Sequence, residues 1–172
     1  LARQLASDLC EQNRQRQQLE QEIAKDIDAM FLEKADILND RVVVLDGEGW
    51  HHGVIGIVCS KVVERTGKPC VLISSDGEEA RGSARSVEGF NIFEYLNEIN
   101  KTNPEIFAGF GGLEGAAGLS VNKKHRGLTL GAFYMLTHSP GAERKRLFYY
   151  RIRAVKPGSV FQQKLLCPIV RY

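Results

Sequence analysis

The chain has 172 residues, of which 43% are hydrophobic and 26% are charged, and its formal net charge is +2. This length and balance are typical of one globular domain with an extension, and no apolar run approaches the roughly 18 residues of a membrane span. The four cysteines show neither CxxC spacing nor a pairing pattern. They disfavour a disulfide scaffold and a structural zinc site, so we expect a reducing, cytoplasmic setting.

The first segment predicts one long amphipathic helix. Residues 2–31 contain neither glycine nor proline. Such a helix packs on its own domain, links to another domain, or forms a coiled-coil dimer. The polar Gln12 and Arg16 interrupt the apolar seam and weaken the last alternative. The apolar residues of this seam, near heptad spacing, are Leu5, Leu9, Leu19, Ile23, Ile27 and Met30.

Residues 41–75 predict a βαβ unit. The β-branched run 41–47 ends in Asp-Gly and predicts a buried strand, apolar residues then recur at helical spacing, and residues 69–75 predict a second strand. Because a helix separates the two strands, we expect them to pair in parallel. Cys59 and Cys70 fall in the apolar runs and are expected to pack in the core.

The following segment predicts a turn and a short strand over 77–89 and an amphipathic helix over 90–100. Residues 107–121 contain many glycines and alanines, which favours either close approach of a ligand to the backbone or tight helix packing. The expected fold class is α/β, with a mixed sheet, a βαβ unit and flanking helices, preceded by a long linker helix.

The charge changes sign near residue 122. Residues 1–121 carry 12 Lys and Arg against 20 Asp and Glu, whereas residues 122–172 carry 11 against 1. The second part is basic, aromatic and β-prone, which predicts a hairpin or two edge strands. We therefore divide the chain into a linker helix (1–35), a central domain (36–121) and a basic extension of unclear origin (122–172).

The pair His51 and His52 lies between the first predicted strand and the helix. Adjacent side chains are expected to diverge, and no further His or Asp cluster completes a coordination shell, so a metal site is disfavoured. The start of a helix offers unpaired N–H groups and the positive end of the dipole. An anion site and a polar turn without function remain the alternatives.

Two further segments offer phosphate chemistry. Arg81, Ser83 and Arg85 alternate along the predicted strand and share one face, with Ser86 at its end. A guanidinium with hydroxyl donors binds phosphate, although a solvated strand face explains the same pattern. The glycines of "GFGGLEGAAG", read as preceding a small-residue helix, let amides reach an oxyanion, with tight helix packing as the alternative.

Three segments in this order resemble the C-terminal, DHH-associated domain of RecJ-type single-strand DNA exonucleases, in the DHH phosphoesterase superfamily: "GWHHGVIGIVCSKVVERTGKPCVLIS", "ARGSARSVEGFNIFEYL" and "FGGLEGAAGLSV". The resemblance covers about residues 5–121, and the first helix resembles the linker helix of that family. It implies a substrate-binding domain that contacts the nucleic-acid backbone. The phosphate-binding residues it implies are His51, Ser83, Arg85, Ser86, Gly111 and Gly112, to which we add His52 of the same turn.

In that family the divalent metal centre, with manganese or magnesium, belongs to an N-terminal domain. The "WHH" at 50–52 is not the family's Asp-His-His motif, so the resemblance implies neither a catalytic residue nor a metal ligand in this chain. The implied partners are single-stranded DNA or a short oligonucleotide, and a catalytic domain of the same parent chain. Leu113 stands where the family has the histidine of Gly-Gly-His, which removes an imidazole donor.

Two other functions fit the same residues. One is the substrate-binding domain of a phosphodiesterase that cleaves oligonucleotides or cyclic dinucleotides. The other is a stand-alone nucleic-acid-binding module, in which the basic residues 122–172 neutralise phosphates and their aromatic side chains stack on bases.

Overall fold

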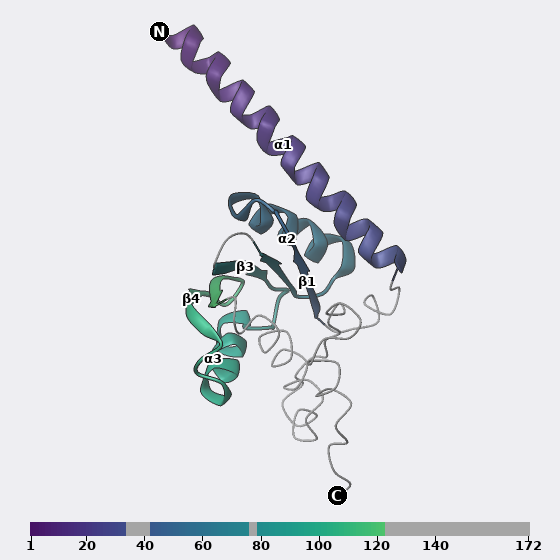
Figure 1. Cartoon of the computed structure of the whole chain (residues 1–172), viewed down its shortest axis with the longest axis vertical. Coiled ribbons are helices and arrows are strands. Elements are labelled where there is room, and N and C mark those ends of the chain that lie inside the picture. Colours follow the sequence, from purple (N-terminus) through teal and green to yellow (C-terminus); the bar gives the residue numbers. More distant parts are fainter. Residues whose placement is uncertain (34–41, 76–78, 123–172) are drawn as a thin grey trace, which may run out of the picture.

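The computed structural model describes residues 1–33, 42–75 and 79–122 (Figure 1). The expectations for residues 123–172 lie outside these ranges. The elements in chain order are α1 (Ala2–Glu33), β1 (Val43–Gly47), α2 (His52–Thr66), β2 (Cys70–Ser74), β3 (Glu79–Arg85), α3 (Ile92–Thr102), β4 (Phe107–Leu113) and β5 (Ala116–Asn122).

The strands form a five-stranded mixed sheet in the order β1-β2-β3-β5-β4. β1 and β2 pair in parallel around α2, and the other neighbours pair antiparallel. The predicted α/β class, with its mixed sheet and βαβ unit, is confirmed. α2 ends at Gly67, whose φ of 65° is the left-handed conformation that glycine adopts without steric cost.

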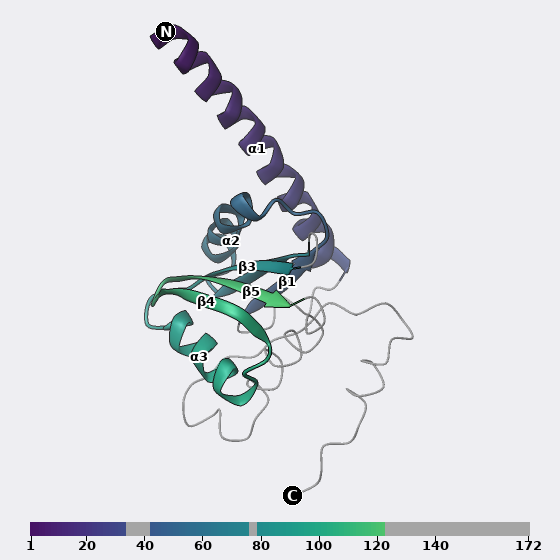
Figure 2. The same cartoon turned by 60° about the vertical axis from the view of Figure 1, so that its left-hand side comes forward.

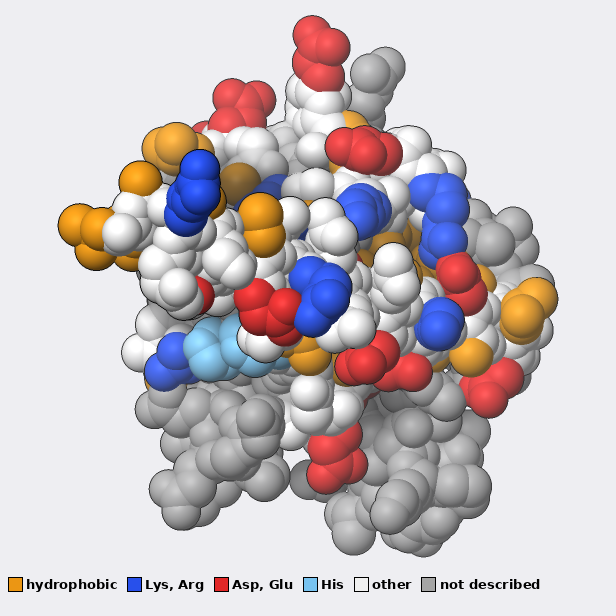
Figure 3. All heavy atoms as spheres, turned by 90° about the horizontal axis from the view of Figure 1, so that it is seen from above, with side chains coloured by type: hydrophobic (Ala, Val, Ile, Leu, Met, Phe, Trp, Pro, Cys, Tyr) orange, Lys and Arg blue, Asp and Glu red, His pale blue; other side chains and the backbone are white. Residues whose placement is uncertain are grey.

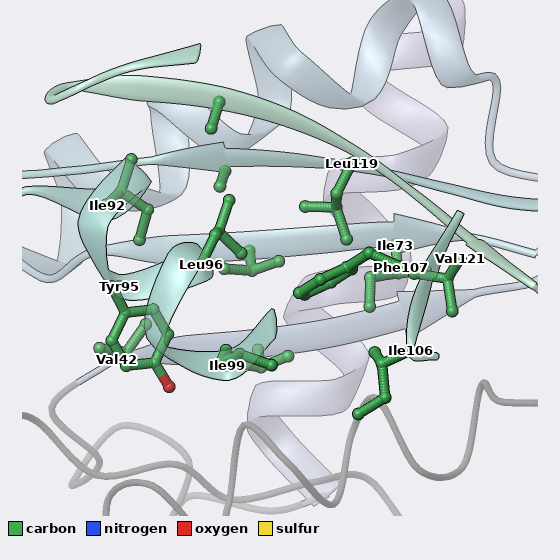
Figure 4. Packing of buried hydrophobic residues seen from close by; sticks show 14 of the residues in the cluster. Val42, Ile73, Ile92, Tyr95, Leu96, Ile99, Ile106, Phe107, Leu119 and Val121 are labelled. Atoms are coloured by element: carbon green, nitrogen blue, oxygen red, sulfur yellow. The ribbon is translucent and has the colours of Figure 1, made fainter. Parts of the chain in front are cut away.

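Helices pack on both faces of the sheet (Figure 2). α3 covers one face, where Leu96 and Ile99 pack toward Ile73 and Leu119 (Figure 4). The other face carries α2 and the C-terminal part of α1, and this second core contains Cys59 and Cys70, which are fully buried as predicted. Removal of this apolar surface from water supplies the main stabilisation of both layers.

The long first helix is confirmed, but only its C-terminal part packs on the domain. Ile23 and Ile27 are buried, whereas Leu5 and Leu9 are 54% and 65% exposed. The N-terminal half of α1 therefore projects away from the sheet (Figure 1). No helix in the described ranges combines the length and the apolarity needed to cross a membrane.

The glycine-rich segment forms a β-hairpin, so the expectation of glycines before a small-residue helix was wrong. β4 and β5 pair with each other, and β5 also pairs with β3 along its whole length. This ladder satisfies the backbone of a segment that has few side chains to bury. Gly112 is required for the pairing, because a Cβ there would overlap the carbonyl group of Ala116.

The contact between Gly47 and Trp50 gives a first prediction. A Cβ at Gly47 would overlap the buried indole ring, so Gly47→Ala must displace Trp50. Overpacking of this kind costs about 1–3 kcal/mol of unfolding free energy. Trp50 is the one tryptophan of the chain, and we expect its fluorescence emission to shift to longer wavelength.

The matched control is Gly118→Ala, because a Cβ there meets no atom within 4 Å. That variant should keep the Trp50 emission and lie within about 0.5 kcal/mol of the parent stability. An unchanged emission maximum and denaturation midpoint in Gly47→Ala would show that the indole does not lie against this glycine.

Candidate functional site

The alternation along β3 places Arg81, Ser83 and Arg85 on the face of the sheet that carries α2. Ser83 is only 9% exposed, whereas Arg85 is half-buried and Arg81 is exposed. The three polar side chains thus lie at the margin of the second core, where the cover provided by α2 ends.

The same face continues across β5 and β4, and no described helix covers it. The strand register places Gly118 and then Gly111 in line with Ser83, and Ala116 and then Leu113 in line with Arg85. We call this surface the open face. It consists of Gly109, Gly111, Leu113, Ala116, Gly118 and Ser120, all exposed or half-buried.

The open face is formed largely by bare backbone. A Cβ built on Gly109, Gly111 or Gly118 would have no neighbouring atom within 4 Å. A ligand can therefore approach the strands closely. Leu113 ends this surface and is 79% exposed. The position that the family resemblance gives to a histidine therefore holds an apolar side chain, in the cross-strand row formed by Arg85, Ala116 and Leu113.

The Arg85 guanidinium is fixed at one edge. Its Nη1 donates to Ser83 Oγ at 3.0 Å and to the carbonyl oxygen of Ala84 at 2.9 Å. In the described part of the chain it has no carboxylate within ion-pair distance. The Nε and Nη2 donors point to no protein acceptor there, which leaves a positive charge and a free donor edge for an anion.

The histidine pair stands at the start of α2. His51 is the N-cap residue and its side chain makes no capping hydrogen bond, and His52 is the first helical residue. The two rings stack with centroids 5.2 Å apart and planes 7° apart, so the expectation that they diverge was wrong. Both side chains are exposed, among basic and acidic neighbours (Figure 3).

Trp50 connects this turn to the rest of the fold. Its indole N–H donates to Asp26 of α1 at 3.0 Å, and its carbonyl oxygen accepts a hydrogen bond from Ser74 Oγ of β2. The ring itself is buried against Gly47. The position of the histidine pair is therefore set jointly by α1, β1 and β2.

Two ion pairs hold α1 on α2. Glu20 is 5% exposed as a residue, and its carboxylate contacts both Arg16 of its own helix and Lys61 of α2. Asp28 pairs with Arg65. A buried carboxylate needs such partners, since an unpaired charge is costly to desolvate.

The structure brings Ser83, Arg85 and Gly111 together on one surface, with the histidine pair at the start of the helix above it. Ser86 lies apart from them. Its hydroxyl donates to the carbonyl oxygen of Phe90, and its N–H donates to that of Gly115 at 2.9 Å. Gly112 lies against the backbone of β5, where a Cβ would come within 2.3 Å of the carbonyl oxygen of Ala116.

Gly56 is a neighbour of Arg85 that sequence reasoning missed. It lies within α2 directly above Ser83 and Arg85. The signal available in the sequence is the glycine itself, because glycine inside a helix is unfavourable by about 1 kcal/mol relative to alanine. A glycine at such a position indicates that another group needs the space.

The described residues do not form a metal centre. Nowhere in 1–33, 42–75 or 79–122 do three or more His, Cys, Asp or Glu side chains gather as ligands. Asp46 and Glu48 precede the histidine pair without joining it in such a group. The donors on this surface instead suit an anion.

Comparison with known proteins identifies the fold. The profile of the DHHA1 domain matches residues 39–130. The single-stranded-DNA-specific exonuclease RecJ of Bacillus subtilis (strain 168) is 35% identical over 122 residues, which cover 70% of this chain and 15% of that protein.

Two solved structures share this fold. RecJ of Thermus thermophilus in complex with Mg²⁺ superimposes with a TM-score of 0.56 at 24% identity, covering 83% of this chain and 20% of that one. An exonuclease RecJ bound to manganese gives a TM-score of 0.56 at 25% identity, covering 76% and 31%. This chain thus spans less than a third of each of these three proteins. Because the profile covers more than half of its 172 residues, the chain belongs to the DHHA1 domain family, in agreement with the resemblance of its sequence to RecJ.

Proposed function

We propose that this chain is the single-stranded-DNA-binding part of a RecJ-like exonuclease, and that it holds the phosphodiester backbone at Arg85. The observation that carries the proposal is the guanidinium itself. It is fixed by Ser83 and by the carbonyl group of Ala84, it has no carboxylate partner in the described residues, and it borders the open face. The Bacillus subtilis relative is a single-stranded-DNA-specific exonuclease, which supports the choice of ligand.

The surroundings of Arg85 favour an extended polyanion over a compact anion. The start of α2 adds N–H groups that no side chain caps, and the exposed Arg81 adds a second charge on the same face of β3. The glycines of the open face let a strand lie close to the sheet. Successive phosphates can thus contact β3 and the helix start, with His51 and His52 beside them.

Hydrolysis is assigned to another part of the parent protein. The RecJ structures contain Mg²⁺ or manganese, and divalent ions of this kind activate water for phosphodiester cleavage. The described residues offer no ligand group for such an ion. As the family resemblance implies, we place the metal centre in a domain upstream of this chain, with residues 1–35 as the linker helix and residues 36–121 as the binding domain.

We also propose a cytoplasmic location for this chain. Cys59 and Cys70 are neighbours in the core and are both free. Burial, together with the neighbouring Cys59 thiol, raises the pKa of the Cys70 thiol well above its ordinary value. The absence of CxxC spacing and of a pairing pattern among the four cysteines supports a reducing compartment.

Replacement of Arg85 tests the binding site. We expect Arg85→Ala to weaken binding of a labelled oligodeoxythymidine of about 12 nucleotides by about 10- to 100-fold, as the loss of charge-assisted hydrogen bonds implies. Fluorescence anisotropy at several salt concentrations should also show the slope of log affinity against log salt reduced by about one.

The control for charge is Arg14→Ala, which removes the same charge from the projecting half of α1, where Arg14 pairs with Glu11. Its affinity should stay within about twofold of the parent. Equal losses in the two variants would mean that binding follows net charge alone, and the site at Arg85 would be rejected.

Replacement of Leu113 tests the direction in which the backbone runs over the open face. Leu113 lies in the Arg85 row, two strands away. A histidine there, with an ordinary pKa of about 6.5, becomes a cation as the pH falls, so the affinity of Leu113→His for the oligonucleotide should rise by about 3- to 10-fold between pH 8 and pH 6.

Leu113→Gln supplies a neutral donor and serves as the control. The pH dependence of its affinity should equal that of the parent protein. The same pH dependence in all three proteins would show that no phosphate passes Leu113.

A further inference from the structure

We infer that Gly56 and Ser83 are positioning residues that set the orientation of the Arg85 guanidinium, an inference that rests on the proposed function. The absence of a side chain at Gly56 lets the guanidinium lie directly against the backbone of α2. Ser83 then acts through Arg85 rather than by contact with the phosphate.

The geometry at Gly56 leaves little room for a side chain. A Cβ there would lie 3.0 Å from Arg85 Nη2 and 3.2 Å from Ser83 Oγ. Both distances are shorter than ordinary van der Waals contact between such atoms. With alanine there, the guanidinium and the Ser83 hydroxyl must each give by a few tenths of an ångström, which disturbs the hydrogen bond between them.

The helix cannot relieve this contact by moving away. Cys59, one turn after Gly56, is fully buried, and its Sγ lies 3.2 Å from the carbonyl oxygen of Cys70 and 3.4 Å from that of Ser83, both within reach of its one S–H donor. These contacts tie α2 to β2 and to β3 at Ser83 itself. The separation of α2 from β3 is thus fixed by the core, and the arginine side chain is the part that yields.

The result is a guanidinium with two distinct edges. Nη1 is bound by Ser83 Oγ and the carbonyl oxygen of Ala84, and no acceptor in the described residues reaches Nε or Nη2. The free edge presents parallel N–H donors, which match two oxygens of one phosphodiester group. The buried Ser83 holds the bound edge in place.

The test is a double-mutant cycle in the full chain, read by anisotropy with the same oligodeoxythymidine. We expect Gly56→Ala to weaken binding about tenfold, the equivalent of one charge-assisted hydrogen bond. Its melting temperature should be unchanged or higher, because alanine is the better helix former. In the Arg85→Ala background, Gly56→Ala should cost no further affinity.

Ser83→Ala provides a second, independent arm of the cycle. It should weaken binding by about 3- to 10-fold in the parent protein and have no effect on Arg85→Ala. If Gly56→Ala lowers the melting temperature, the cycle of Ser83→Ala with Arg85→Ala alone decides whether the orientation of Arg85 depends on positioning residues. Losses of affinity that add fully to that of Arg85→Ala would overturn the inference.

The same cycle separates this inference from the proposed function. If Arg85→Ala binds as tightly as the parent, the proposed binding site fails. If Arg85→Ala is weak but Gly56→Ala and Ser83→Ala bind normally, the binding site stands and the positioning roles are wrong.

Discussion

The indole of Trp50 is the contact on which the arrangement of this domain depends. The ring fills the space above Gly47 at the end of β1, and its N–H donates to Asp26 of α1. The backbone carbonyl oxygen of Trp50 accepts a hydrogen bond from Ser74 of β2. The chain therefore turns from β1 into α2 at one defined place. Since His51 is the next residue and occupies the N-cap position of α2, the direction of the helix and the position of its N-terminal N–H groups follow from this turn.

From that turn, α2 runs over β3 and determines the environment of Arg85. The thiol of Cys59 fixes the helix on the backbone of Ser83, and Gly56 lies over the guanidinium. A core contact thus determines how a charged group at the surface is presented. Electrostatic recognition is strongest when the charge is held in place before the ligand arrives, because little ordering remains to be done on binding.

α1 shares in this arrangement, because Asp26 contacts Trp50 and because Glu20 and Asp28 pair with α2. A displacement of α1 would move the side chain of Trp50, and with it the adjacent histidine pair. The projecting half of the helix leaves Leu5 and Leu9 exposed, as the linker role proposed for residues 1–35 requires.

Patterns in the sequence predicted most of this fold. Regular spacing of large apolar residues predicted α1 and α2, and the β-branched runs predicted β1 and β2. The period of two along β3 placed Ser83 and Arg85 on one face. The hairpin of β4 and β5 was missed because its glycines carry no side chains from which a period can be read, and pairing with β3 decides its conformation. The stacking of His51 on His52 and the role of Gly56 depend on contacts between distant segments, which spacing does not reveal.

The most direct test of phosphodiester binding at Arg85 is a nuclear magnetic resonance titration of the ¹⁵N-labelled chain with oligodeoxythymidine. We expect the Nε–H signal of Arg85 to shift together with the backbone amides of His52 and Gly56, while the Nε–H signal of Arg14 stays in place. An Arg85 signal that is unmoved at saturation, or shifts confined to α1, would contradict the claim that the phosphodiester backbone is held at Arg85.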